Sequence, residues 1–297
     1  MANKNDSLGD RMKSYEYITR NYRPRRLPVI IRIDGKAFHS FTRGFKRPFD
    51  PILMHAMQNT ALALCKNIEG CKLAYVQSDE ISLLLTDYDN LNTNPWFEKN
   101  LQKIVSISAS MATLYFNNSF KQHIFNVSYP PASDSESVKE NDEFIQSMYG
   151  FTPEETRSHK WWDEYFVALQ SAKCKGAMFD ARAFVLPKEE VCNYFIWRQQ
   201  DATRNSIQMV GQANFSHKEL QNKSCNDIQD MLMLQKGINW NDFDTVKKRG
   251  SCCTKTGTRT VVDMKTGEQK ERLAWKIDDE IPIFTQDRNY IDKWVFI

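Results

Sequence analysis

Short apolar runs predict the strands in the first third of the chain. Val29 to Ile33 is a mostly β-branched run that ends at Asp34-Gly35, which indicates a strand followed by a tight turn. Cys71 to Val76 and Ile81 to Leu85 flank the polar residues 77–80, and two strands with so short a connection predict a hairpin. The connection lacks the Asn-Gly or Asp-Gly pair of the tightest turns, so this prediction rests on the apolar runs alone.

Longer segments with helical periodicity separate these strands. Ile52 to Lys66 predicts a helix, and Asn94-Pro95 predicts the start of another that runs to about Asn117. Ala177 to Leu186 predicts a further strand, Pro187 starts a long helix, and Cys225 to Lys236 predicts a smaller one. The helix that starts at Asn94-Pro95 carries a polar stripe of Lys99, Lys103, Ser106, Ser110 and Thr113.

Two segments depart from this pattern. From Tyr129 to Lys175 the periodicity breaks down and acidic residues dominate, so we predict an exposed insertion with one helix around Lys160 to Gln170. Arg259 to Lys265 and Gln269 to Ile277 flank a Thr-Gly pair, which predicts a C-terminal β-hairpin. The order of elements predicts an α+β fold, in which an antiparallel sheet carries helices on one face. We expect residues 1–244, with the insertion at 129–175, to form the main domain, and residues 245–297 to form a β-rich appendage.

Composition excludes several classes of protein. The chain has 297 residues, 41% of them hydrophobic, which is enough to bury a sizeable core. The first residues, Met1 to Arg11, are polar, and no apolar run is long enough to cross a membrane. We therefore expect a cytoplasmic protein without a membrane partner. The seven cysteines show neither the spacing of a zinc site nor that of a disulfide framework.

Positive charge is concentrated near the N-terminus. Eleven Lys or Arg residues lie between Arg11 and Arg47, and only Glu16 and Asp34 oppose them. Such an excess can steer a polyanion such as RNA or a nucleoside triphosphate. It can equally be an ordinary solvated surface, and the charge by itself does not decide between the two.

Asp34 and Asp79 form a candidate metal site. Asp34 ends the first predicted strand and Asp79 lies in the hairpin turn, so both carboxylates reach one sheet edge if these strands are neighbours. Two adjacent carboxylates repel each other unless a cation lies between them, and Mg²⁺ accepts carboxylate, phosphate and water ligands. Two such ions about 4 Å apart can catalyse a phosphoryl displacement. Gly35 permits close approach of a triphosphate because it lacks a Cβ, and its carbonyl could itself be a ligand. The alternative is that both aspartates are ordinary turn residues.

Five short motifs surround these aspartates. Residues 32–41 read RIDGKAFHSF, and Phe45, Arg47-Pro48 and Asp50 follow in a fixed spacing. Residues 74–80 read AYVQSDE, residues 179–182 read FDAR, and residues 197–201 read WRQQD. In type and order these motifs resemble those of the tRNA-histidine guanylyltransferase family, and five in order make a specific match.

The resemblance implies a polymerase-palm fold whose catalytic domain adds nucleotides to a tRNA 5′ end in the 3′-to-5′ direction. It implies two Mg²⁺ ions held by Asp34, the Gly35 carbonyl and Asp79, with Glu80 beside them as a catalytic residue. It also implies that ATP activates a 5′-monophosphate end, and that GTP or another nucleoside triphosphate is then added. The family further implies a homotetramer.

The remaining site residues follow from the matched motifs and from the need for cations around phosphate. Arg47 stands where the family usually has lysine, and its planar fork differs from a point charge. His39 is a structural or nucleotide-contacting residue rather than a general base. Trp161-Trp162 is expected to pack within the insertion rather than to stack on bases. The expected nucleotide or triphosphate ligands are Arg32, Lys36, Ala37, Phe38, His39, Arg47, Ser78 and Lys103. The expected RNA or triphosphate ligands are Lys99, Arg182, Arg198, Asp201 and Asn205.

The chain departs from the family after the WRQQD motif. Family members that act on histidine tRNA carry HINNLYN there, whereas residues 203–209 read TRNSIQM. Thr203 replaces the histidine, and only Asn205 is retained. This resembles the guanylyltransferase-like branch, which repairs truncated tRNA 5′ ends by templated addition.

Three alternatives remain open. Guanylylation of histidine tRNA uses the same chemistry. A nucleotidyl cyclase shares the palm-like fold and the two aspartates, but requires no RNA. A non-catalytic RNA-binding module would bind tRNA without turnover.

Overall fold

One six-stranded antiparallel sheet organises the chain, in the order β4-β1-β3-β2-β5-β6. The computed structural model describes residues 7–128, 135–157, 159–262 and 269–296. The four strands predicted in the first 186 residues are confirmed with small shifts of their ends. The strands are β1 Val29–Gly35, β2 Cys71–Gln77, β3 Glu80–Leu85, β4 Phe179–Val185, β5 Ser251–Val262 and β6 Gln269–Asp278.

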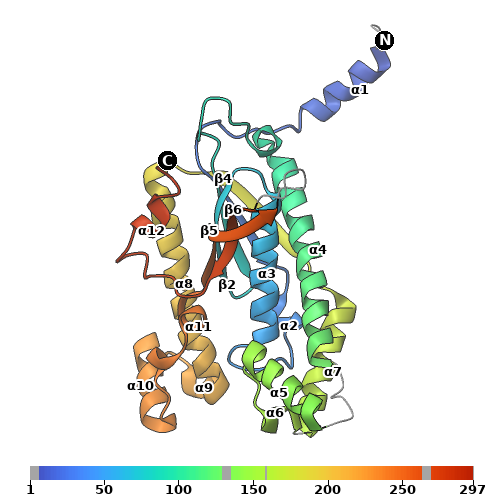
Figure 1. Cartoon of the computed structure of the whole chain (residues 1–297). Helices are drawn as coiled ribbons and strands as arrows, with labels where there is room; N and C mark the ends of the chain where they lie inside the picture. The colour runs from blue at the N-terminus through green and yellow to red at the C-terminus, as the bar shows by residue number, and fades with distance from the viewer. Residues whose placement is uncertain (1–6, 129–134, 158, 263–268, 297) are drawn as a thin grey trace.

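Helices cover both faces of this sheet (Figure 1). The α+β class is confirmed, but the prediction that helices cover only one face is wrong, because α8 (Lys188–Asn214) packs its apolar side on the second face. The two long helices α3 and α4 cover the first face. The described helices are α1 Ser7–Tyr17, α2 Phe38–Phe41, α3 Pro51–Asn67, α4 Leu101–Ser128, α5 Ser135–Tyr149, α6 Pro153–Arg157, α7 His159–Lys175, α8, α9 His217–Leu220, α10 Cys225–Lys236, α11 Thr245–Arg249 and α12 Asn289–Asp292.

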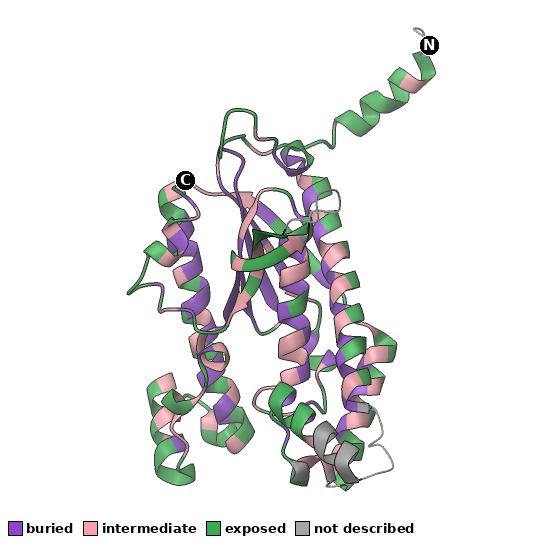
Figure 2. Ribbon diagram, viewed as in Figure 1, coloured by how far each residue is buried: buried purple, intermediate pink, exposed green. Residues whose placement is uncertain are grey.

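Alternation along β1 divides the core into two layers. Ile31 and Ile33 pack into the cluster under α3 and α4, whereas Ile30 packs into the cluster under α8. Successive side chains of a strand point to opposite faces, so a central strand covered on both sides is apolar throughout. The buried residues of Figure 2 accordingly run through the sheet and along the inner sides of the long helices. At the end of the strand, the same alternation turns Arg32 and Asp34 towards the α8 face.

The helix predicted to start at Asn94-Pro95 begins later and ends later. Residues Trp96–Lys99 form a 3₁₀ turn in which Phe97 and Glu98 have positive φ, and α4 then runs from Leu101 to Ser128. The side chain of Asn100 accepts a hydrogen bond from the Lys103 amide at 3.1 Å. An asparagine in this position caps a helix, and this cap sets the start of α4.

The acidic segment 129–175 is more helical than predicted. It contains α5, α6 and α7, with residues 129–134 and 158 outside the described part. Ile145, Tyr149 and Phe151 are buried in the α3–α4 core together with Tyr165 and Leu169. The prediction of an exposed insertion with one helix is therefore wrong, because widely spaced apolar residues bury one side of otherwise acidic helices. Trp161 and Trp162 are partly buried against this core, as predicted.

The C-terminal residues belong to the same sheet and core. The predicted hairpin is β5–β6, and its connection at 263–268 lies outside the described residues. Residues 251–254 of β5 pair with β2, so only the distal part of the hairpin projects as an exposed ribbon. Ile281 and Phe284 pack beside Tyr75 of β2. Residues 245–297 are thus continuous with the main domain rather than a separate appendage.

The N-terminal helix α1 extends away from the body of the molecule (Figure 1). None of its residues is buried. None of the helices in the described part of the chain has the length and apolar character that a membrane span requires.

Candidate active site

Strand pairing brings Asp34 and Asp79 to one end of the sheet. In the β1–β3 register Asp34 lies opposite Glu80, and the Gly35 amide donates a hydrogen bond to the Asp79 carbonyl at 3.1 Å. The hairpin turn consists of Ser78 and Asp79 alone, and Ser78 has φ of 48°. The two aspartates, separated by 45 positions in the sequence, are therefore neighbours, as the pattern predicted.

Burial and negative charge make Asp79 costly to ionise. Desolvation, together with the negative charges of Asp34 and Glu80, raises the pKa of Asp79 to about 6, although hydrogen bonds to its carboxylate act in the opposite direction. A carboxylate in such surroundings is stabilised by a nearby cation. In the described residues no three His, Cys, Asp or Glu side chains form a metal cluster. Two carboxylates and the Gly35 carbonyl nevertheless fit Mg²⁺, which takes few protein ligands and completes its shell with phosphate and water.

Gly35 is required by packing as well as by the site. A Cβ at this position would lie 2.3 Å from the Phe38 ring. The ring of Phe38 packs in turn on Phe116 and Phe179, so it has little room to move. The close contact explains why glycine follows Asp34.

Glu80 does not lie open beside the two aspartates. Its carboxylate accepts two hydrogen bonds from Arg198, from Nε at 2.8 Å and from Nη2 at 2.7 Å. Arg198 also donates to Asp201 at 3.0 Å, and Glu80 and Arg198 are both buried. This contradicts the prediction that Arg198 binds RNA or triphosphate, because a guanidinium paired in this way holds Glu80 instead. The Glu80 carboxylate is therefore not an open ligand in this structure.

Arg32 belongs to the same largely buried polar layer, which consists of Arg32, Glu80, Arg198 and Asp201. Its Nε lies 3.7 Å from Glu80 Oε2, and this buried nitrogen has no hydrogen-bond partner in the described structure. Asp201 serves as a second anchor of the layer, since it accepts hydrogen bonds from Arg198, Arg204 and Asn205. The WRQQD and AYVQSDE motifs are therefore joined by direct contacts.

Lys99 lies away from the two aspartates and links the N-terminal segment to Asp87. Its ammonium donates to the carbonyls of Pro24 and Leu27, each at 2.8 Å, and to the Asp87 carboxylate at 3.0 Å. These three bonds use all three protons of a side chain that is 3% exposed. The prediction that Lys99 binds RNA or triphosphate is wrong. It assumed that Lys99 lies on the polar face of the helix, whereas Lys99 precedes α4 and its ammonium is buried against the N-terminal segment.

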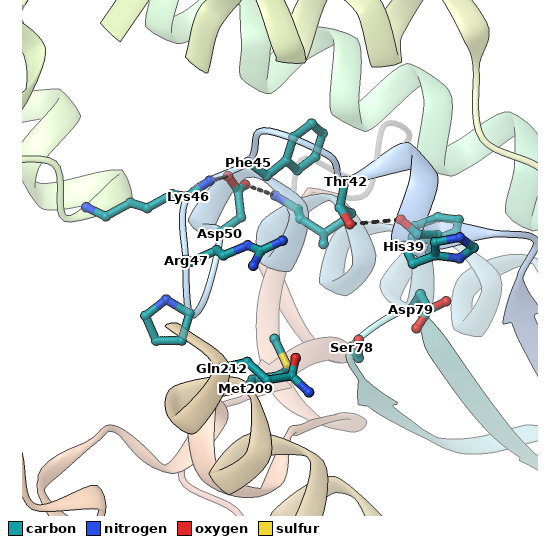
Figure 3. A pocket seen from close by; sticks show the side chains of 13 residues that line it. His39, Thr42, Phe45, Lys46, Arg47, Asp50, Ser78, Asp79, Met209 and Gln212 are labelled. Atoms are coloured by element: carbon teal, nitrogen blue, oxygen red, sulfur yellow. Dashed lines mark hydrogen bonds between the residues drawn. The ribbon is translucent and has the colours of Figure 1, made fainter. Parts of the chain in front are cut away.

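A cavity of about 350 Å³ adjoins Asp79 (Figure 3). Four predicted nucleotide ligands line it together, namely Phe38, His39, Arg47 and Ser78. Lys36 and Ala37 lie at the preceding turn, where both are exposed and Ala37 adopts φ of 54°. Phe45, Pro48 and Asp50 of the second motif also line the cavity. The sequence pattern did not single out the remaining lining residues: Thr42, Lys46, Leu53, Met209 and Gln212.

The loop that bears Arg47 is held by Asp50 and Lys46. The Asp50 carboxylate caps α3 by accepting from the Leu53 amide at 2.9 Å and also accepts from Tyr165 at 2.8 Å. Burial raises the pKa of Asp50 against these hydrogen bonds. Lys46 forms an ion pair with Glu155 at 2.8 Å. Arg47 has no hydrogen bond or ion pair in the described part of the chain, so its guanidinium is available to a ligand.

Three predicted residues lie outside the Asp79 cavity. Lys103 is exposed on α4, 5.9 Å from the Phe97 ring, in a pocket of its own. Arg182 is exposed on the edge strand β4, with Nε 3.7 Å from Asp180. Asn205 lines an adjoining pocket that also reaches Ser78.

Comparisons with known proteins identify relatives. A family model described as tRNAHis guanylyltransferase matches residues 9–141. A bacterial tRNA(His) guanylyltransferase-like protein solved with ATP is 42% identical, with a TM-score of 0.72, over 98% of this chain and 100% of that chain. Such a bacterial protein solved with GTP is 40% identical, with a TM-score of 0.70 and the same coverage. The tRNA(His) guanylyltransferase of Debaryomyces hansenii is 27% identical over 75% of this chain and 71% of the relative.

Proposed function

The chain belongs to the tRNA(His) guanylyltransferase family, and we propose that it repairs tRNA 5′ ends by templated addition of nucleotides in the 3′-to-5′ direction. It is a nucleotidyltransferase, with ATP and GTP or other nucleoside triphosphates as substrates. The observation that carries the proposal is the convergence of Asp34 and Asp79 beside a cavity lined by Arg47, His39 and Ser78.

In the proposed mechanism Asp34, Asp79 and the Gly35 carbonyl would hold two Mg²⁺ ions, and bound Mg²⁺ would supply a Lewis acid for the attacking hydroxyl and positive charge against the phosphates. Arg47 neutralises a triphosphate from the wall of the cavity, and His39 contacts the nucleotide. Arg198 holds Glu80 through two hydrogen bonds and Arg32 lies beside it, so the Glu80 carboxylate keeps a fixed orientation next to Asp79. Burial of this layer strengthens each of these electrostatic interactions.

The proposed reaction has two steps, activation of the 5′ end and addition of the nucleotide. A 5′-monophosphate oxygen of the tRNA attacks the α-phosphate of ATP, and pyrophosphate leaves. The 3′-hydroxyl of the incoming nucleotide then attacks the activated 5′-phosphate, loses its proton, and AMP leaves. A tRNA with a 5′-triphosphate needs no activation, because pyrophosphate is already a leaving group.

The choice of substrate rests on Thr203. This residue occupies the place of the histidine of HINNLYN, and it lines a pocket with Trp240 and Arg249. The departure favours templated repair over strict guanylylation of histidine tRNA, which remains the second candidate function. By resemblance we also propose a cytoplasmic homotetramer.

Extension of a labelled tRNA tests the proposal. A tRNA lacking its first nucleotide and carrying a 5′-label is incubated with Mg²⁺, ATP and each nucleoside triphosphate in turn. Extension only by the nucleotide complementary to the opposing base supports templated repair. Addition of G to full-length histidine tRNA alone supports guanylylation, and release of a cyclic nucleotide without RNA supports a cyclase. If neither a 5′-monophosphate nor a 5′-triphosphate tRNA is extended, the proposal fails.

A further inference from the structure

A second, larger cavity adjoins the active-site cavity. It has a volume of about 680 Å³ and shares the side chains of Arg47 and Gln212 with the cavity that contains Asp79. Both shared side chains are visible at the wall of the first cavity in Figure 3. The second cavity lies among the loop before α3, the last turns of α8, helix α9 and the start of α10. Its lining is Arg47, Gln208, Gln212, Phe215, His217, Leu220, Gln221, Asn222, Lys223 and Ile228.

The polar groups of this cavity lack internal partners. Its lining contains two permanent cations, one histidine and four side-chain amides, and no carboxylate. In the residues that the structure describes, none of these seven side chains forms a hydrogen bond or an ion pair. Lys223 interacts with Asp227 only through the longer-range charge attraction that helps to lower the pKa of that carboxyl.

The neighbouring cavity near α11 differs in this respect, although it is also lined by cations. There Lys247 pairs with Asp244 at 2.6 Å, and Lys248 donates to the Asn241 carbonyl at 2.6 Å. Arg249 donates to the Ile281 carbonyl at 3.2 Å. These cations stabilise the fold, whereas the side chains of the larger cavity retain their full capacity to bind a ligand.

The chemistry of the lining matches single-stranded RNA. Each amide offers both a donor and an acceptor, which is what the edge of an unpaired nucleobase requires. Lys223 and Arg47 supply positive charge for phosphates. Unpaired bases expose their edges, whereas the bases of a duplex do not, so amides in a concave surface favour a single strand.

We propose that this cavity binds the unpaired 3′ end of the tRNA while its 5′ end occupies the cavity of Asp79. The proposal rests on the proposed function. In a tRNA the strand opposite the 5′ end continues into the single-stranded 3′ terminus, so an unpaired segment lies beside the reacting end. A cavity that shares Arg47 with the active site is placed to receive it.

A binding experiment with two forms of tRNA tests this assignment. One form is intact and the other lacks the unpaired 3′ nucleotides, and affinity for each is measured without nucleoside triphosphate. Lys223→Ala and Gln208→Ala should each weaken binding of the intact tRNA about five- to tenfold and leave that of the trimmed form unchanged. Lys218→Ala, an exposed lysine of α9 outside the cavity, serves as the matched control and should change neither.

Equal weakening of both forms by Lys223→Ala would show only general attraction to RNA and would overturn the proposal. A raised KM for the nucleoside triphosphate with unchanged tRNA affinity would assign the cavity to a nucleotide and would overturn it too. Both substituted side chains are exposed, and thermal unfolding checks that the variants remain folded. Binding is measured without turnover, so this outcome does not depend on whether the wild-type protein extends tRNA. Extension of tRNA is the separate test of the proposed function.

Discussion

The guanidinium of Arg198 holds the carboxylate of Glu80 through two hydrogen bonds, Nε to Oε1 at 2.8 Å and Nη2 to Oε2 at 2.7 Å. Both groups are buried between the sheet and α8. A bidentate pair of this kind fixes orientation as well as charge. It joins two of the sequence motifs and holds the Glu80 carboxylate beside Asp79.

Breaking this pair should destabilise the protein. Arg198→Ala leaves Glu80 buried without its partner, which we expect to lower the free energy of unfolding by about 3–5 kcal/mol. Denaturant unfolding measures this loss. Arg204→Ala removes an exposed guanidinium from the same cluster and should cost less than about 1 kcal/mol. Equal effects of the two substitutions would contradict the structural role of Arg198.

Replacing either aspartate should separate activity from stability. Asp34→Asn or Asp79→Asn is expected to reduce tRNA extension by about 10³-fold or more, because the cation site loses a carboxylate. Asp79→Asn should slightly raise the melting temperature without Mg²⁺, since it removes repulsion from Asp34 and Glu80.

Magnesium removal gives the second measurement for these variants. Mg²⁺ should raise the melting temperature of wild-type protein, and this rise should disappear in both variants. Asp230→Asn, which alters an exposed carboxylate of α10, should keep the rise. Retention of the Mg²⁺ effect by Asp34→Asn would show that the ion binds elsewhere.

Lys99 and Lys103 should respond in opposite ways to substitution. Lys99→Ala removes the cation from the buried Asp87 carboxylate and the donor from two carbonyls, so the free energy of unfolding should fall by about 3 kcal/mol. Lys103→Ala removes an exposed ammonium and should change stability by less than about 0.5 kcal/mol. Extension kinetics corrected for the folded fraction should show a defect for Lys103→Ala alone.

Stability should fall in mild acid because of His123. Burial lowers the pKa of His123 to about 4, with a contribution from His55. The unfolded chain, with an ordinary histidine pKa of about 6.5, therefore binds more protons between pH 6.5 and 4. Over that window the free energy of unfolding should decrease as the pH falls, by about 1–3 kcal/mol.

The pH effect should depend on the contacts of the ring. His123 Nδ1 lies 2.9 Å from the Tyr149 hydroxyl, and Nε2 lies 2.9 Å from the Asn59 amide. His123→Gln should flatten the stability profile between pH 6.5 and 4. A variant that kept the wild-type slope would show that another group titrates.

Local patterns of residues determined most elements of this protein. The apolar runs around Asp34 and Asp79 predicted β1, β2 and β3, because side-chain alternation is a property of neighbouring residues. The convergence of the two aspartates followed from the hairpin and one further strand pairing. The five motifs then indicated the family, which the relatives confirm.

Only the tertiary structure decided which charged residues serve the site and which serve the fold. Glu80 and Arg198 are 118 positions apart, and Lys99 finds its carbonyl partners more than seventy positions earlier. No local period encodes such pairings, because they depend on how α8 and the N-terminal segment pack against the sheet. For the same reason the sequence did not predict that β5 pairs with β2 in the main sheet. Nor did it predict the cavity beside Arg47, whose lining comes from segments far apart in the chain.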